Sequence, residues 1–308
     1  MSDSSATLGA PTSIRSYLLS EAPSSRRQAA WGGAYRRWLQ LRRNKLAMTG
    51  LVTVIVLVVA ALAAPLLATH APGAQDLTQR LQPPSAQHWL GTDELGRDLY
   101  SRVLYGGRVT LGMVVAVVLL VAPLGLAVGT IAGYAGGVTD RILMRITDIF
   151  LAFPRLVLAL AFVAALGPGV TSAVIAVALT AWPPFALLSR SETLAIRRAD
   201  YIAVVRLMGA SPSRIILSHI APLCVSSLIV RVALDMSGII MTAAGLGFLG
   251  MGAQPPMPEW GTMIATTRGF ILDQWWVPTI PGVAILVASL GFNLLGDGLR
   301  DVLDPKQE

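Results

Sequence analysis

The chain has 308 residues, of which 54% are hydrophobic and only 13% are charged, and its mean hydropathy is +0.63. A soluble domain carries roughly a quarter charged residues, so this composition indicates a membrane protein. The net charge is +7, but eight of the 24 basic residues lie in the first 45 positions, and few aromatic residues accompany them. This pattern is typical of a membrane topology signal, and we expect no nucleic-acid partner.

Charge-poor apolar segments of about 20 residues predict helices that cross a bilayer. The first begins too late and is too long for a secretory signal, so we expect it to remain as an uncleaved span. The third and fourth of these apolar segments form a hairpin that turns at 167–169. In chain order the six segments lie at 46–68, 109–139, 149–166, 170–189, 225–246 and 274–295. The sequence therefore predicts an all-α integral membrane protein with six transmembrane helices.

The basic residues also predict the orientation of the chain. With both termini inside, 17 basic residues fall in inside segments, five fall in outside segments, and Arg155 and Arg231 fall within spans. Inside segments of membrane proteins carry such an excess of lysine and arginine. We therefore expect a basic cytoplasmic tail at 1–45, an outside segment at 69–108, a transmembrane core at 109–295 and a cytoplasmic tail at 296–308.

The inside segment 190–222 is unusually long and polar for a connection within a bundle. Ile202, Val205 and Met208 recur every three residues and predict a short helix with one apolar face. A turn at Gly209 and a second short helix that closes at Pro222 would follow. Long connections in compact bundles are often functional, so this segment is either a docking element for a soluble partner or a surface loop that carries topology arginines.

The second half of this segment resembles the cytoplasmic "EAA" loop of ABC importer permeases. In that family the loop forms the coupling helices that bind the ATPase subunit. The family's Glu-Ala-Ala falls on Ala203, Val204 and Val205, so the glutamate is missing here. The resemblance implies ATPase coupling through Tyr201, Ala203, Val204, Val205, Leu207, Met208, Gly209, Ala210, Ser211 and Pro222.

A second pattern lies in the outside segment, at 91–102. It resembles the Gly-Thr-Asp-x-x-Gly-Arg-Asp-x-x-Ser-Arg pattern of the dipeptide/oligopeptide/nickel permease family, in particular the second permease of each pair. The matching residues are Gly91, Thr92, Asp93, Gly96, Arg97, Asp98, Ser101 and Arg102. If the segment is helical, Asp93 with Arg97 and Asp98 with Arg102 are spaced to form ion pairs. It is then either an elbow that fixes the outer end of the second span, with a rim for the binding protein, or a site of solute contact.

Further matches to this family cover most of residues 42–305. They include Asp148 to Pro154, Leu246 to Gly252 and Asn293 to Asp301. The resemblance implies a type I ABC importer permease fold in the bacterial inner membrane, for di- or oligopeptides, with nickel chelates or glutathione as alternatives. It also implies four kinds of partner: a second homologous permease, two ATP-binding subunits that hold ATP and magnesium, a periplasmic or lipid-anchored solute-binding protein, and membrane lipid.

Charges within the spans are a separate signal, because ionised groups in a bilayer are costly and often functional. Arg231 and Asp235 are four residues apart and face the same side of a helix. Arg155 lies near the inner end of the third span, where its side chain can reach the headgroups. These three residues are candidates for the translocation path, with packing against the second permease as the alternative.

No motif for chemistry accompanies these features. The two lysines, Lys45 and Lys306, do not follow a glycine-rich phosphate loop, so we expect no ATP site and no catalysis in this chain. Cys224 is the single cysteine, and His70, His88 and His219 are far apart in sequence, so we expect no metal site. The alternatives are a secondary transporter or channel that works alone, and an intramembrane hydrolase that uses Ser237 beside Asp235.

Overall fold

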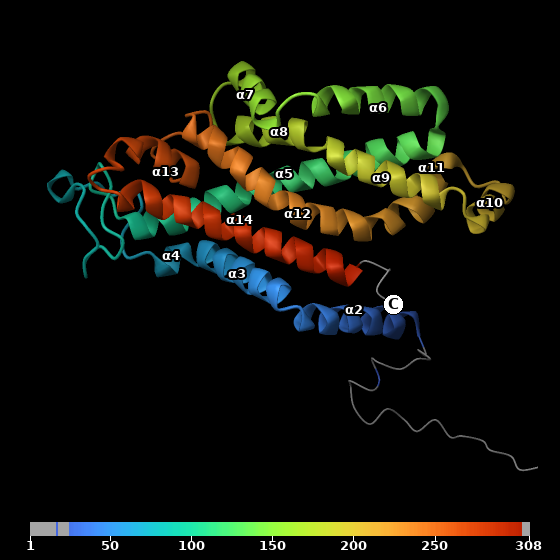
Figure 1. The fold of residues 1–308 in the computed structure, drawn as a ribbon, viewed down its shortest axis with the longest axis horizontal. Helices are drawn as coiled ribbons and strands as arrows, with labels where there is room; N and C mark the ends of the chain where they lie inside the picture. The colour runs from blue at the N-terminus through green and yellow to red at the C-terminus, as the bar shows by residue number, and fades with distance from the viewer. Residues whose placement is uncertain (1–16, 18–24, 304–308) are drawn as a thin grey trace, which may run out of the picture.

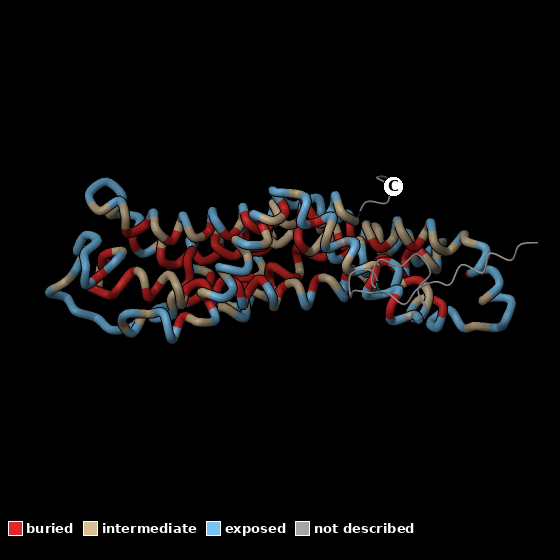
Figure 2. Tube along the Cα trace, turned by 90° about the horizontal axis from the view of Figure 1, so that it is seen from below, coloured by how far each residue is buried: buried red, intermediate tan, exposed pale blue. Residues whose placement is uncertain are grey.

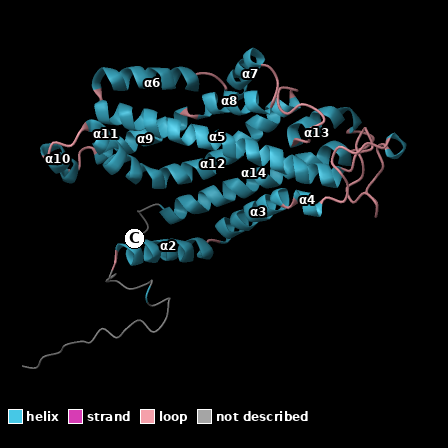
Figure 3. Ribbon diagram, turned by 180° about the vertical axis from the view of Figure 1, so that it is seen from behind, coloured by secondary structure: helices cyan, strands magenta, loops and turns pink. Residues whose placement is uncertain are grey.

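The computed structural model describes residue 17 and residues 25–303. The described residues form helices and loops without strands; Thr92 and Asp98 make one isolated β-bridge (Figure 3). The long helices are α2 (Arg26–Arg43), α3 (Lys45–Leu62), α5 (Leu99–Ala135), α6 (Gly137–Leu151), α7 (Arg155–Leu166), α8 (Val170–Ala181), α9 (Pro183–Ile196), α12 (Ala221–Phe248) and α14 (Trp276–Leu303). The predicted all-α fold is confirmed.

Short helices occupy the connections at the two ends of the bundle. They are α4 (Ala64–Leu67), η1 (Leu77–Gln79), α10 (Asp200–Leu207), α11 (Pro212–Ile215), the π-helical turn η2 (Ile216–Ile220), α13 (Trp260–Thr267) and η3 (Arg268–Phe270). Figure 1 shows α10 and α11 at one end, on the same half as α2 and the end of α14. We call this the knob end. The loop after α4 and α13 lie at the opposite end, the elbow end.

Five helical segments are long and apolar enough to cross a membrane: α3, α5, α8 with α9, α11 through α12, and α14. A sixth crossing is formed if α6 and α7 act as one span, although they meet at an angle of 93°. The bend falls at 152–154, where Pro154 prevents the helix from continuing. The third span was predicted to begin at Ile149. This start is wrong, because Ile149 lies in the last turn of α6.

Helix α5 packs most extensively against α9, and small residues make this approach possible. Gly125, Gly129 and Gly133 recur every four residues on one face of α5. An added Cβ on Gly129 would collide with the backbone oxygen of Ala186, and one on Gly133 would lie 2.7 Å from Cβ of Thr193. Membrane helices associate through such small-residue faces, because lipid supplies no hydrophobic drive for helix association.

Other helix boundaries also differ from the predicted ones, and α14 continues to Leu303, beyond the predicted end at 295. Helix α5 begins at Leu99, ten residues before the predicted second span, because Asp98 caps its N-terminus and accepts a hydrogen bond from Ser101 N. Helix α9 continues to Ile196, beyond the predicted end at 189. The basic segment at 1–45 also contains the helix α2, which the sequence analysis did not predict.

The buried residues form a core along the bundle, while the tips of the loops at both ends are exposed (Figure 2). Fully buried side chains such as Phe185, Ile239 and Ile240 come from α9 and α12. Many large apolar side chains remain exposed on the outer faces of the long helices, as expected for a surface that meets lipid or a partner. This core holds the elbow end and the knob end at a fixed separation.

Candidate functional site

The elbow, residues 91–102, is organised around the buried carboxylate of Asp93. Arg97 Nε lies 2.6 Å and Arg102 Nε 3.2 Å from Asp93 Oδ2. The other carboxylate oxygen accepts hydrogen bonds from the backbone N–H groups of Leu95 and Arg97. The predicted Asp93–Arg97 pair is therefore present, but it lies in a loop rather than in a helix.

The predicted Asp98–Arg102 pair is wrong, because Asp98 serves as the cap of α5. Its carboxylate accepts hydrogen bonds from Ser101 N at 2.8 Å and Ser101 Oγ at 2.7 Å, and it lies 2.9 Å from His88 Nδ1. Burial alone would raise the pKa of Asp98, but these hydrogen bonds outweigh it and hold the pKa below its ordinary value. Arg102 turns instead to Asp93 and to the carbonyl oxygen of Pro72.

Two histidines meet at Asp98, although the sequence analysis treated them as unrelated. The rings of His70 and His88 are 4.6 Å apart, and the ligand-type atoms of His70, His88 and Asp98 all lie within 4.8 Å of one another. His88 Nε2 lies 2.9 Å from Gln79 Oε1, so both ring nitrogens of His88 have hydrogen-bond partners. The group is a hydrogen-bond network that ties the loop after α4 to the start of α5.

All eight matching residues of the elbow are buried. Gly91 has φ of +80°, and an added Cβ would lie 2.5 Å from the backbone oxygen of Gln82. The eight residues are therefore not exposed to a binding protein, and the elbow fixes the start of α5. A docking rim, which remains a prediction, has to be formed by exposed neighbours such as Trp89 and Leu77.

Glu259 is a fully buried carboxylate that the sequence analysis missed. It caps α13 by accepting hydrogen bonds from Gly261 N and Thr262 N, and Thr110 Oγ1 of α5 lies 3.2 Å from it. Burial raises its pKa above the ordinary value, against the lowering effect of these hydrogen bonds. An acidic residue immediately before Trp260 was the available signal, since acidic residues favour helix N-termini.

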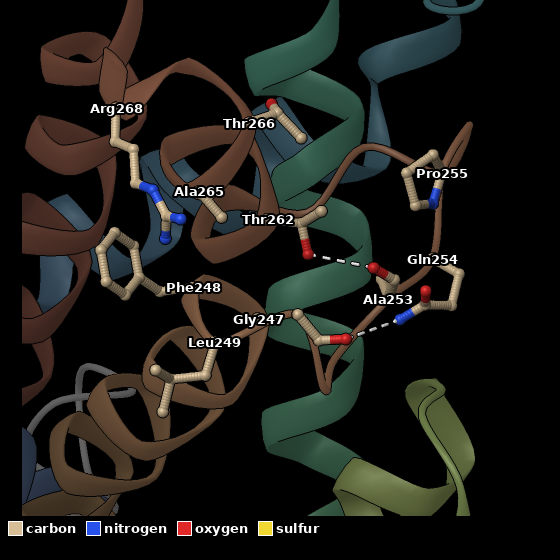
Figure 4. A pocket seen from close by; sticks show the side chains of 11 residues that line it. Gly247, Phe248, Leu249, Ala253, Gln254, Pro255, Thr262, Ala265, Thr266 and Arg268 are labelled. Atoms are coloured by element: carbon tan, nitrogen blue, oxygen red, sulfur yellow. Dashed lines mark hydrogen bonds between the residues drawn. The ribbon is translucent and has the colours of Figure 1, made fainter.

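A pocket of about 300 Å³ opens beside this junction, between the end of α12 and α13. Figure 4 shows Arg268 and Phe248 facing each other, and the guanidinium carbon lies 5.7 Å from the ring centre. On the opposite side, Thr262 donates to the backbone oxygen of Ala253. The pocket combines a cation, an aromatic ring and amide groups at the elbow end of the molecule.

The knob, residues 201–222, protrudes from the opposite end of the bundle. Gly209 follows α10 with φ of +81°, which confirms the predicted glycine turn. On the inner side of the knob, Ile202, Ile215 and Ile220 are fully buried and pack with Cys224. Arg206 lies over the ring of Tyr134, which joins α10 to the end of α5.

The outer surface of the knob carries large apolar side chains that the rest of the described chain leaves exposed. Leu207 is 87% exposed and Met208 81%, while Tyr201 and Val204 are about half exposed. The spacing predicted that Met208 lies on the same face of the helix as Ile202. Met208 is instead exposed on the outer side, while Ile202 is buried. Of the remaining candidates, Ala203 and Ser211 are exposed, and Val205 and Ala210 are partly buried.

The second knob helix does not end at Pro222, contrary to the prediction. Pro222 lies in the first turn of α12, and α11, η2 and α12 continue into the fifth span. In the π-helical turn before it, Ala221 N donates to Ile216 O. The hydrogen-bond register thus changes next to the proline, which has no N–H to donate.

The three candidate residues of the spans come together as one charge cluster. Arg155 Nη1 lies 3.4 Å from Asp235 Oδ2, and Arg231 Nη2 lies 3.7 Å from Asp235 Oδ1. Arg155 thus turns toward α12 and not toward the headgroups, which corrects the sequence analysis. Ser237 donates to Asn293 Oδ1 at 2.7 Å and makes no contact with Asp235, so the hydrolase alternative has no nucleophile–base pair.

Comparison with known families identifies the chain. The model of the binding-protein-dependent transport system inner membrane component matches residues 125–308, and that of the N-terminal transmembrane domain of oligopeptide transport permease C matches residues 34–84. The chain therefore belongs to the family of inner-membrane components of binding-protein-dependent transport systems. It is a multi-pass permease of the ABC importer class, a class that is not itself catalytic.

Curated relatives match over nearly their whole length. The chain is 44% identical to the probable D,D-dipeptide transport system permease protein DdpC of Escherichia coli, covering 94% of this chain and 98% of that protein. It is 43% identical to the dipeptide permease DppC of Alkalihalophilus pseudofirmus, with 90% of each chain covered. It is also 43% identical to the glutathione permease GsiD of Pectobacterium atrosepticum, over 90% of this chain and 91% of the relative.

The fold is similar to that of a solved importer. A chain of the MetNI methionine ABC transporter, in an inward-facing conformation, aligns with a TM-score of 0.53 and 19% identity. The alignment covers 66% of this chain and 97% of that chain. The type I importer permease fold predicted from the sequence is thus confirmed, and the alternative of a transporter working alone is not supported.

Proposed function

We propose that this chain is one of two permease subunits in an ATP-driven importer of di- or oligopeptides. Relatives whose names specify D,D-dipeptide and dipeptide transport match it over at least 90% of its length, which supports a peptide as the solute. A second homologous permease completes the translocation path. Two ATP-binding subunits hold ATP and magnesium, and a solute-binding protein outside delivers the peptide.

The observation that carries this proposal is the exposed apolar surface of the knob. Leu207 and Met208 project from a short helix that is fixed to the bundle by the buried Ile202. Large apolar side chains that water would otherwise surround are typical of a protein interface. The knob therefore docks the ATPase, and because Ala203 stands in place of the family's glutamate, apolar packing contributes more than ion pairing.

The orientation follows from the same arrangement. The knob, α2 and the end of α14 share one half of the bundle, and the elbow lies at the other end. Docking to a cytoplasmic ATPase puts the knob inside, so both termini are cytoplasmic and the elbow faces the periplasm. Closure of the two ATPases would move the knobs together and switch the path between inward-facing and outward-facing states.

The test is Gly209→Val in the complete transporter reconstituted in vesicles. A valine at φ of +81° is strained by roughly 1–2 kcal/mol. We expect normal insertion, with ATP hydrolysis uncoupled from uptake or the ATPase released. Gly250→Val is the matched control, because Gly250 has φ of +77°, equally open surroundings and a place near the elbow end. Full ATP-driven uptake by Gly209→Val would contradict the proposal.

A further inference from the structure

The charge cluster of Arg155, Arg231 and Asp235 contains two cations and one anion. Asp235 is the only acidic partner of either arginine among the residues that the structure describes. The distances of 3.4 and 3.7 Å are longer than those of a charge-assisted hydrogen bond. One positive charge is therefore left over, and neither arginine is tightly held by the carboxylate.

Several donors of the two guanidinium groups also lack acceptors. Arg155 Nε, Arg155 Nη2 and Arg231 Nε are buried and have no hydrogen-bond partner. Buried donors are nearly always satisfied in folded proteins, so each such group requires an explanation. The two arginines converge on Asp235, and guanidinium groups match the two oxygens of a carboxylate.

The place of the cluster excludes lipid as its environment. Asp235 is the fifteenth residue of the 28-residue helix α12, near the middle of a span. Arg231 is 37% and Arg155 26% exposed in their side chains, so both are accessible from outside this chain. Ionised groups at that depth face protein or a water-filled path and not hydrocarbon.

Gly238 and Phe185 lie next to the cluster. Gly238 lies one turn beyond Asp235, and an added Cβ there would be 3.5 Å from Arg155 Nη1, an ordinary contact distance. On the other side the Arg231 guanidinium carbon lies 5.9 Å from the centre of the Phe185 ring. A methyl-sized group at Gly238 would thus lie in contact with Arg155 without displacing it.

We propose that Arg155 and Arg231 bind the terminal carboxylate of the peptide as it passes through the membrane. The inference rests on the proposed peptide import and adds the part of the solute that this chain recognises. Asp235 orients the two guanidinium groups and neutralises one of them. Partial neutralisation keeps binding weak enough for release, as conduction through a path requires.

The experiment uses the assembled transporter in vesicles, with Cys224→Ser and Gly238→Cys in this chain. We measure the rate at which anionic and cationic methanethiosulfonates modify the thiol that the Gly238→Cys substitution introduces. One net positive charge within about 5 Å favours the anionic reagent by about tenfold. Arg155→Gln or Arg231→Gln should abolish this preference, whereas Arg300→Gln, an exposed arginine near the C-terminal end of α14, should not.

Protection identifies the group that binds. A dipeptide with a free carboxylate should slow modification, and its C-terminal amide should not. Equal protection by both, or no charge preference while ATP-driven uptake persists, overturns the carboxylate site but leaves peptide import standing. An introduced thiol that reacts in the isolated chain but not in the complex shows that the second permease covers the cluster, which also overturns the site.

If Gly238→Cys does not insert, transport kinetics of Arg231→Gln test the site instead. A KM raised about tenfold with kcat retained is the supporting result, and an unchanged KM overturns the site.

Discussion

Arg155 Nη1 lies 3.4 Å from Asp235 Oδ2, although 80 residues separate the two in sequence. The contact joins the start of α7, directly after the 93° bend, to the middle of α12. A broken span is thus held to a continuous one by an ion pair. The bend and the charge cluster depend on each other for that reason.

Asp235→Ala should destabilise the protein by on the order of 2 kcal/mol, because it leaves two arginines in the span without a counter-ion. The melting temperature of the detergent-solubilised chain, followed by tryptophan fluorescence, measures this loss. The double variant Asp235→Ala/Arg155→Gln should recover part of it. An Asp235→Ala protein as stable as the parent would show that the pair contributes nothing.

Gly129→Ala should separate α5 from α9, because the new methyl group collides with the Ala186 backbone. We expect a lower melting temperature, with a cost of about 1–3 kcal/mol for overpacking. Gly112→Ala is the matched control on the same helix, since no atom lies within 4 Å of its added Cβ. That variant should be neutral or slightly more stable, as alanine favours helices over glycine. Equal effects of the two substitutions would contradict the close packing.

Asp93→Asn should impair folding more than transport, because two buried arginines lose their shared carboxylate. Removing one partner of a buried pair costs about 3–5 kcal/mol. The measurement is the yield of assembled transporter after detergent extraction. Glu94→Gln, which removes only the outer partner of Arg97, should have a much smaller effect. Normal assembly of Asp93→Asn with lost uptake would instead place a direct functional contact at the elbow.

Acid should weaken the elbow through Asp98. Its folded-state pKa lies below the ordinary value, so the stabilisation is fully present above the unfolded pKa of about 4 and is lost as the pH falls through the folded pKa. The melting temperature should therefore fall as the pH decreases from about 5 to about 3. Asp98→Asn should be less stable at neutral pH by about 1 kcal/mol and should show a flatter pH profile. An identical slope in both proteins would exclude Asp98 as the group responsible.

The knob should bind its ATPase largely through apolar contact. Leu207→Ser and Met208→Ser should each weaken co-purification of the ATPase, since both side chains are exposed in this chain. The association of the parent protein should change little between about 0.1 and 1 M salt, because screening acts on charges and not on apolar packing. Release of the ATPase by salt alone would favour ion pairing instead.

Features that depend on local chemistry were predictable from the amino-acid order alone. Apolar segments long enough to cross a bilayer predicted the spans, and the glycine at 209 predicted a turn that only a residue tolerant of positive φ adopts readily. The order of the motifs was sufficient to recognise the family. Each of these signals is carried by neighbouring residues, and no knowledge of packing is needed to interpret it.

The contacts between distant side chains, in contrast, depend on the folded arrangement of the chain. Arg102 pairs with Asp93 and not with Asp98, and His70 reaches His88, because the loop after α4 folds back on the start of α5. Asp98 and Arg102 have the sequence separation of helical partners, but Asp98 lies outside the helix as its cap. Pairing of this kind depends on the relative placement of distant segments, which close packing and burial fix and which local periodicity does not encode.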